Sequence, residues 1–119
     1  DGLQTRSFLY IDECVNAVIK LMNSNFSDPV NIGSEEMVSI NKLAQNAIDI
    51  SEKNITINNL EGLEFEKKHG FPCPTGVRGR NSDNKLFSEK VGWEYSENLI
   101  EGMKKTYYWI EDQVNKSKV

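Results

Sequence analysis

Long apolar runs, a surplus of basic residues and cysteine pairs are all missing from this 119-residue chain. No stretch approaches the roughly 20 apolar residues that a membrane-spanning helix needs, and no signal-peptide pattern is present. The net charge of -4 argues against a nucleic-acid binder, which normally has a basic face. Cys14 and Cys73 lack metal-ligand spacing, so no metal site is expected. We expect a reduced, cytoplasmic protein without a membrane or nucleic-acid partner.

The common signatures of nucleotide-dependent enzymes are missing as well. No glycine-rich turn of the dinucleotide-binding kind follows an apolar segment, and there is no phosphate-binding loop ending in Gly-Lys-Ser or Gly-Lys-Thr. The single histidine, His69, follows two lysines and has no carboxylate or cysteine nearby in the sequence to orient it. We interpret it as a solvent-exposed loop residue. The sequence therefore predicts no catalytic and no cofactor-binding residue within this chain.

Apolar residues with helical spacing predict about four helices. The first expected helix begins at Asp12 and ends near residue 22, and the second runs from 40 to 48 with Ser39 as its cap. The third spans about 84–91, between Asp83 and Gly92, and the last begins at Ser96. On the first helix, Cys14 is interpreted as a packing residue. On the last, the run 106–110 (TYYWI) could stack on a nucleobase, but its apolar spacing favours core packing. Trp93 is expected to pack against the short third helix and hold it to the core.

Three short segments have strand character, at 7–11, 30–33 and 55–60. They are too few and too separated to form a sheet by themselves. They would serve as edge strands of a sheet whose other strands come from sequence outside these residues. Proline and glycine within 62–76 predict a loop there. The fold class is thus α/β, with about four helices and three short strands.

Two arginine clusters stand out in this acidic chain. Gln4, Thr5 and Arg6 place an amide, a hydroxyl and a guanidinium in sequence, and Arg78 and Arg80 lie between glycines at 76 and 79 and a polar run. Guanidinium groups bind phosphate oxygens in a bidentate fork, and glycine lets the backbone approach a ligand closely. Each arginine alone is more often a surface ion-pair partner. Two such clusters together favour an anion-binding site.

Several motifs, taken in order, resemble the C-terminal part of the extended short-chain dehydrogenase/reductase family, the NAD-dependent nucleotide-sugar epimerases and dehydratases. They are RSFLYIDECV (6–15), VNIGS (30–34), RGRNSDN (78–84) and VGW (91–93). The resemblance is narrowed to members that epimerise GDP-mannose at C3 and C5 by four longer segments, DGLQTRSF, EEMVSIN, GVRGRNSDN and TYYWIEDQV. It covers nearly all 119 residues.

The resemblance implies roles for matching positions. Gln4, Thr5 and Arg6 would contact the nucleotide-sugar, and Arg80 would hold its diphosphate. The loop that presents Arg80 would be shaped by Arg78, Asn81, Ser82 and Asp83. Asn31 and Ser34 would be structural. The segment 61–75, with His69 and Cys73, departs from the family pattern, which leaves the fine substrate preference open.

The same resemblance places the family's glycine-rich NAD turn and its catalytic residues upstream of residue 1. We therefore expect residues 1–119 to be one C-terminal, substrate-binding portion of an extended Rossmann-type enzyme that lacks the N-terminal NAD-binding core. The start at Asp1 without methionine also suggests a fragment. The implied partner is GDP-mannose or a related nucleotide-sugar, and the whole enzyme would be a homodimer. The fragment alone is expected to be inactive. Another epimerase, a 4,6-dehydratase or a non-catalytic binding module remains the alternative.

Overall fold

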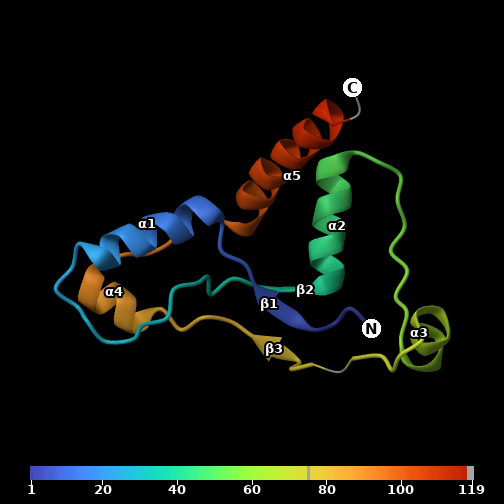
Figure 1. Ribbon diagram of the computed structural model, residues 1–119, viewed down its shortest axis with the longest axis horizontal. Coiled ribbons are helices and arrows are strands. Elements are labelled where there is room, and N and C mark those ends of the chain that lie inside the picture. The colour runs from blue at the N-terminus through green and yellow to red at the C-terminus, as the bar shows by residue number, and fades with distance from the viewer. Residues whose placement is uncertain (75, 118–119) are drawn as a thin grey trace. The chain divides into compact units, whose positions relative to one another are not determined.

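The computed structural model describes residues 1–74 and 76–117 (Figure 1). Within these residues it contains five helices and three short strands. The chain divides into two compact units. Unit 1 comprises Asp1–Arg6 and Val38–Arg80, and unit 2 comprises Ser7–Met37 and the chain from Asn81 onward. The sequence predicted about four helices, one fewer than the structure contains, because a helix forms in the expected loop.

The three strands form one sheet with the order β2-β1-β3. Their bounds are β1 Thr5–Ser7, β2 Met37–Ser39 and β3 Gly79–Arg80. None coincides with an expected strand, and the expectation that the strands would not form a sheet by themselves was wrong. The reason is that strands this short are defined by the partners with which their backbones bond, and hydropathy does not encode those partners.

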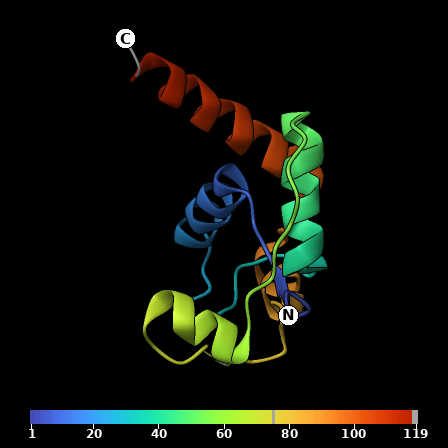
Figure 2. The same cartoon turned by 90° about the vertical axis from the view of Figure 1, so that its right-hand side faces the viewer.

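Helix α2 (Ile40–Ser51) and helix α3 (Gly62–His69) complete unit 1. The predicted cap of α2 is confirmed, since the Ser39 side chain accepts a hydrogen bond from the Lys42 backbone N–H at 3.1 Å. After α2 the chain runs back in the opposite direction through residues 52–61 to reach α3 (Figure 1 and Figure 2). The expected strand at 55–60 does not form, and Ile55 and Ile57 of that segment are exposed.

The expectation of a loop over 62–76 was wrong for its first half, where α3 forms. The residues LEFEKK (63–68) are mostly good helix formers, with Glu64 in the first turn and basic residues in the last. Gly70 ends the helix in the left-handed conformation, at a φ of 78°. The prolines at 72 and 74 come after this cap, so they do not interrupt the helix.

Unit 2 is built on helices α1 (Ile11–Met22), α4 (Lys85–Val91) and α5 (Leu99–Lys116). Its core consists of Ala17, Phe87 and Trp93, with the two aromatic rings 5.3 Å apart between centroids. The predicted packing role of Trp93 is thus confirmed. Val30 and Ile32 pack against this core from an extended segment without a strand partner. This explains the strand character of residues 30–33.

Helix ends in unit 2 are only partly as predicted. Gly92 ends α4 in the left-handed conformation, as expected. Asp12 is not the cap of α1, since the cap position is Tyr10 and Asp12 lies in the first turn. Helix α5 begins after Asn98, which accepts from the Glu101 N–H, whereas Ser96 bonds to Glu13. A polar side chain near a helix start therefore indicated each helix but not always its first residue.

Apolar side chains of α1 and α5 lie on the surface of the described chain. On α1 these include Val15, Ile19 and Met22, and Cys14 is half-buried. On α5 the core-packing prediction for residues 106–110 was wrong, because Tyr108 and Trp109 are 56% and 65% exposed. An apolar stripe shows which face of a helix is suited to burial, but not whether a partner covers it.

Candidate functional site

The sheet brings the two arginine clusters together. Strand β1 pairs with β3 in parallel, with Thr5 opposite Gly79 and Arg6 opposite Arg80. The Thr5 backbone N–H donates to the Arg78 carbonyl at 2.8 Å. Paired positions on neighbouring strands carry their side chains on the same face. Two arginines from distant parts of the sequence thus occupy paired backbone positions, and an anion between their guanidinium groups would offset the repulsion of the two like charges.

The three arginines have different environments. Arg78 Nη1 lies 2.6 Å from Asp1 Oδ2, so its charge is already paired. Arg6 is half-buried and donates from Nη1 to the Thr5 carbonyl at 2.7 Å. Arg80 is exposed, and its guanidinium has no hydrogen bond or ion pair within residues 1–74 and 76–117. Arg80 is therefore the arginine of this group that is most available to an external anion.

A cavity of about 590 Å³ opens beside these strands within unit 1. Gln4 and Arg78 line it from the strand side. Its other walls come from α3 and from the segment that follows α3, including Glu66 and Cys73. The sequence did not reveal this wall, because α3 was expected to be a loop. The departure of residues 61–75 from the family pattern was the one signal that marked the region.

The remaining predicted site residues, Asn81 and Asp83, lie in unit 2. Asn81 is exposed. The Asp83 carboxylate accepts from the Lys85 N–H at 3.1 Å, and the Asp83 carbonyl accepts from the Asn31 amide at 3.4 Å. These contacts support the start of α4 and connect the NSDN segment (81–84) to the VNIGS segment (30–34). A direct role in binding stays a prediction for both residues.

The connection between these segments centres on Asn84, which is 7% exposed. Its amide donates to the Gly33 carbonyl at 2.7 Å, and its oxygen accepts from the Ser82 hydroxyl at 2.6 Å. The Ser82 N–H donates to the carbonyl of buried Ser34 at 3.4 Å. A methyl group at Gly33 would lie 2.5 Å from the Ser82 Cβ, so glycine is required for this close approach. The two segments are thereby held in one arrangement.

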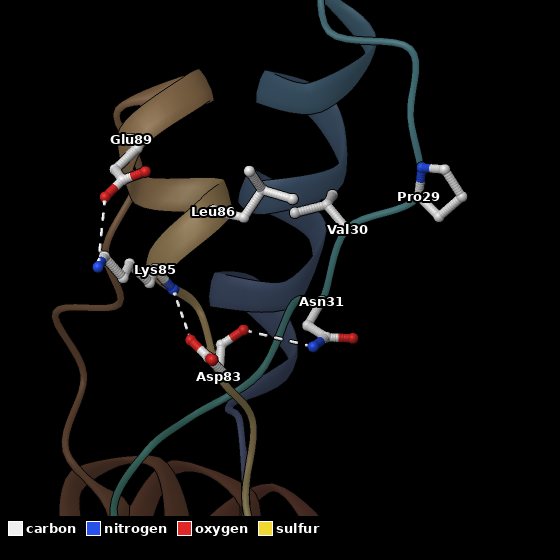
Figure 3. A pocket seen from close by; sticks show the side chains of 7 residues that line it. All are labelled: Pro29, Val30, Asn31, Asp83, Lys85, Leu86 and Glu89. Atoms are coloured by element: carbon white, nitrogen blue, oxygen red, sulfur yellow. Dashed lines mark hydrogen bonds and ion pairs between the residues drawn. The ribbon is translucent and has the colours of Figure 1, made fainter.

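A second cavity, of about 520 Å³, lies between α4 and the segment before Asn31 (Figure 3). Figure 3 shows the apolar side chains of Val30 and Leu86 facing one another, with Asp83 bonded to Asn31 below them. Lys85 pairs with Glu89 at 3.9 Å. The Asp83 carboxylate accepts from the Lys85 backbone N–H, so the charged residues that line this cavity interact with one another.

His69 and Cys73, which were not expected from the sequence to be catalytic, lie at the end of α3 and in the segment that follows it. His69 ends α3 instead of lying in a loop, and its ring contacts Phe65 at 4.4 Å between centroids. Its exposure agrees with the prediction. Cys73 is a half-buried free thiol. Among the described residues there is no group of three potential metal ligands, and no described helix is long and apolar enough to cross a membrane.

Curated relatives match nearly the whole chain. GDP-mannose 3,5-epimerase of Arabidopsis thaliana is 50% identical over 118 residues, which are 99% of this chain and 28% of that protein. GDP-mannose 3,5-epimerase 1 of Oryza sativa subsp. japonica is 48% identical with the same coverage. UDP-glucuronic acid decarboxylase 3 of Arabidopsis thaliana is 31% identical, covering 86% of this chain and 27% of that protein. The chain thus spans little more than a quarter of these relatives.

Solved structures support the same fold. UDP-N-acetylglucosamine 4-epimerase from Methanobrevibacter ruminantium M1 matches 95% of this chain and 33% of that one, with a TM-score of 0.79 and 23% identity. UDP-glucose 4-epimerase from Thermotoga maritima matches 96% and 34%, with a TM-score of 0.76 and 25% identity. UDP-glucuronic acid 4-epimerase from Bacillus cereus, solved with NAD, matches 95% and 33% with a TM-score of 0.74 and 25% identity.

No protein-family profile matches the sequence. The whole-length similarity nevertheless agrees with the resemblance carried by the RSFLYIDECV, VNIGS and RGRNSDN segments. The chain is therefore related to the extended short-chain dehydrogenases/reductases and corresponds to the C-terminal portion of their nucleotide-sugar epimerase and dehydratase members, with higher identity to the GDP-mannose 3,5-epimerases than to the UDP-glucuronic acid decarboxylase.

Proposed function

We propose that this chain is the nucleotide-sugar-binding portion of a GDP-mannose 3,5-epimerase-like enzyme. The observation that carries the proposal is the pairing of Arg6 with Arg80 across β1 and β3. It concentrates positive charge in a chain that is acidic overall. The identities of 50% and 48% to two GDP-mannose 3,5-epimerases support GDP-mannose as the ligand over other nucleotide-sugars.

In this proposal Arg80 holds the diphosphate. A guanidinium can donate two parallel hydrogen bonds to phosphate oxygens, and the Arg80 side chain is exposed and unpartnered within the described residues. Arg6 lies at the paired position and adds charge. Gln4, just before β1, and Thr5, within it, add an amide and a hydroxyl near the paired arginines. By fixing the diphosphate, these residues orient the attached sugar for the chemistry of the complete enzyme.

The cofactor of that chemistry has no binding turn in this chain. NAD supplies reversible hydride removal from a sugar carbon in enzymes of this family, and the residues described here do not fit it. Neither α1 nor α2 is preceded by a glycine-rich turn: the residues at their cap positions are Tyr10 and Ser39. We infer that another part of a longer protein binds NAD and carries the catalytic groups. The chain alone is then inactive. From the family resemblance we also propose that the complete enzyme is a cytoplasmic homodimer.

Calorimetric titration of the complete protein tests the proposal. GDP-mannose should bind more tightly than UDP-glucose or dTDP-glucose. Arg80→Ala should weaken GDP-mannose binding by about 10- to 100-fold, because a charge-assisted hydrogen bond contributes about 1.5–3 kcal/mol. Lys90→Ala, which removes an exposed charge at the end of α4, is the matched control and should leave binding unchanged. Equal affinity for the three nucleotide-sugars would reject GDP-mannose as the preferred ligand.

A second candidate is an enzyme that acts on a UDP- or dTDP-sugar. It is favoured by the fold similarity to UDP-glucose 4-epimerase and to a dTDP-glucose 4,6-dehydratase from Bacillus anthracis. The same titration separates the two candidates by the base of the preferred ligand. A non-catalytic binding module would bind a nucleotide-sugar without converting it, so incubation of the complete protein with GDP-mannose and NAD, followed by product analysis, decides that point.

A further inference from the structure

The Asp1 carboxylate connects the chain before β1 to the segment that enters β3. Its Oδ2 lies 2.6 Å from Arg78 Nη1, and its Oδ1 accepts from the Leu3 backbone N–H at 3.0 Å. All three residues belong to unit 1. The side chain of Asp1 is 27% exposed, whereas that of Arg78 is 69% exposed. A half-buried carboxylate thus holds an arginine side chain that lies mostly in solvent.

The backbone that carries this carboxylate is held by contacts other than the ion pair with Arg78. The Asp1 carbonyl accepts from the side-chain amides of Asn41 and Asn59, both at 3.1 Å. The Asn41 backbone N–H, in the first turn of α2, donates to the Gly2 carbonyl at 2.9 Å. Gly2 has a φ of 71°, and a methyl group there would overlap the Asn41 side chain, so glycine is required. The carboxylate is therefore presented from a fixed position.

Arg78 in turn takes part in the pairing of β1 with β3. Its carbonyl accepts from the Thr5 N–H at 2.8 Å, directly before the register in which Thr5 lies opposite Gly79 and Arg6 opposite Arg80. Strand β3 is only two residues long. Each backbone bond contributes modestly to stability, so a strand this short depends on additional contacts to keep its register.

We propose that Asp1 is a positioning residue of the diphosphate grip. Its ion pair holds Arg78, the Arg78 carbonyl bonds to Thr5, and this pairing places Arg80 opposite Arg6. The ion pair also occupies the Arg78 guanidinium, so the diphosphate is held by Arg80. This inference rests on the proposed function and adds a residue that acts through Arg78 without touching the ligand.

The direction of the effect distinguishes this role from a direct effect of charge. A carboxylate close to a diphosphate repels it, so removal of that charge alone would strengthen binding. A positioning role predicts the opposite: Asp1→Asn should weaken GDP binding to the complete protein by about 2- to 5-fold, the effect of one exposed ion pair. Asp1→Glu keeps the carboxylate and should recover part of the loss. Calorimetric titration measures these affinities.

The matched control removes a carboxylate from the same unit. The Asp49 carboxylate, on α2, accepts from the Gln45 amide at 2.8 Å and is exposed. Asp49→Asn is the same chemical change as Asp1→Asn, and it should leave GDP binding unchanged. Weakening of the same size in Asp49→Asn would overturn the inference, because the effect would then belong to the net charge.

Two further readouts separate positioning from a general loss of structure. The ratio of GDP affinity to GMP affinity reports the contribution of the second phosphate, and Asp1→Asn should lower this ratio. A general loss of structure would weaken both ligands equally. In the Arg78→Ala background, Asp1→Asn should weaken GDP binding no further, because the partner through which Asp1 acts is already absent.

The outcomes also separate this inference from the proposed function. Tighter GDP binding by Asp1→Asn, an unchanged ratio of GDP to GMP affinity, or additive effects of Asp1→Asn and Arg78→Ala would each overturn the role of Asp1. The diphosphate grip would remain intact in these cases if Arg80→Ala still lowers the ratio. A ratio that is insensitive to Arg80→Ala would instead contradict the proposed function itself.

Discussion

Arg6 and Arg80 occupy directly paired positions on the parallel strands β1 and β3. Two like charges at such positions repel each other, and this repulsion contributes nothing favourable to the fold of the ligand-free chain. Sites that violate a local rule of stability in this way are commonly sites of function. The pairing therefore leads to different predictions for stability and for binding.

Replacing Arg80 should affect these two quantities in opposite directions. Arg80→Ala removes the repulsion with Arg6, so the melting temperature of the ligand-free complete protein should be unchanged or slightly higher. The same variant should lose most of the increase in melting temperature that saturating GDP-mannose produces, since a ligand stabilises only through its affinity for the folded state. Arg80→Lys should recover part of the binding, because an ammonium keeps the charge but not the bidentate fork. Differential scanning fluorimetry with and without ligand measures both effects. A large loss of stability without ligand would indicate a structural role.

The close approach of Gly33 to Ser82 predicts a steric defect with a rescue. Gly33→Ala places a methyl group 2.5 Å from the Ser82 Cβ, and overpacking of this kind costs about 1–3 kcal/mol. The double variant with Ser82→Gly removes the opposing Cβ and should recover part of the loss. Denaturant unfolding of the four proteins in this cycle measures the coupling. Additive effects of the two substitutions would show that the contact is not responsible.

The core of unit 2 predicts the largest loss of stability. Phe87 is fully buried and Trp93 is 2% exposed, so truncation of either ring to alanine should cost about 3–5 kcal/mol. Trp93→Phe keeps an aromatic ring next to Phe87 and should cost clearly less. The measurement is the free energy of unfolding from denaturant titration. If Trp93→Phe and Trp93→Ala were equally destabilising, ring packing would not be the cause.

Glu13 predicts a pH-dependent contribution to stability. Its carboxylate accepts from the Ser96 hydroxyl at 2.6 Å and from the backbone N–H groups of Ser96 and Glu97, both at 3.0 Å. These bonds, with the Ser96 hydroxyl first, lower the pKa of Glu13 below its ordinary value of 4.5. A lowered folded-state pKa stabilises the protein above pH 4.5, and this stabilisation is lost as the pH falls through the folded-state value.

Replacement of Glu13 tests that contribution. Glu13→Ala should destabilise the protein at pH 7 by about 1–2 kcal/mol, a value kept low because the bonds are partly exposed to water. The difference between the variant and the unmodified protein should shrink as the pH is lowered below 4.5. Ser96→Ala removes only the hydroxyl donor and should give a smaller effect with the same pH trend. A difference that stays constant with pH would exclude ionisation of Glu13 as its source.

Helices were the part of the fold that the sequence predicted well, since their signals are local. Ser39 and Gly92 mark helix ends with side-chain and backbone preferences that operate over one turn. Helix α3 was missed because the prolines at 72 and 74 and Gly70 were taken to prevent regular structure throughout 62–76. All three lie beyond the last residue of the helix. Strands of two or three residues have no comparable local signal.

The candidate site was predictable in its residue types but not in its assembly. The sequence indicated that Gln4, Thr5 and Arg6 form one polar cluster and that Arg78 and Arg80 form another. Nothing in their spacing showed that β1 and β3 pair in parallel, because the pairing joins residues 74 positions apart, as Arg6 and Arg80 show. The wall formed by α3 could not be predicted either, since it depends on where that helix packs.

Helix α3 contains no buried residue. Apart from the half-buried Phe65, which contacts the rings of His69 and Phe71, its side chains can therefore be exchanged at little cost to the free energy of unfolding. A wall of this kind allows the lining of the cavity to change over evolution by substitutions that leave the sheet and the core untouched.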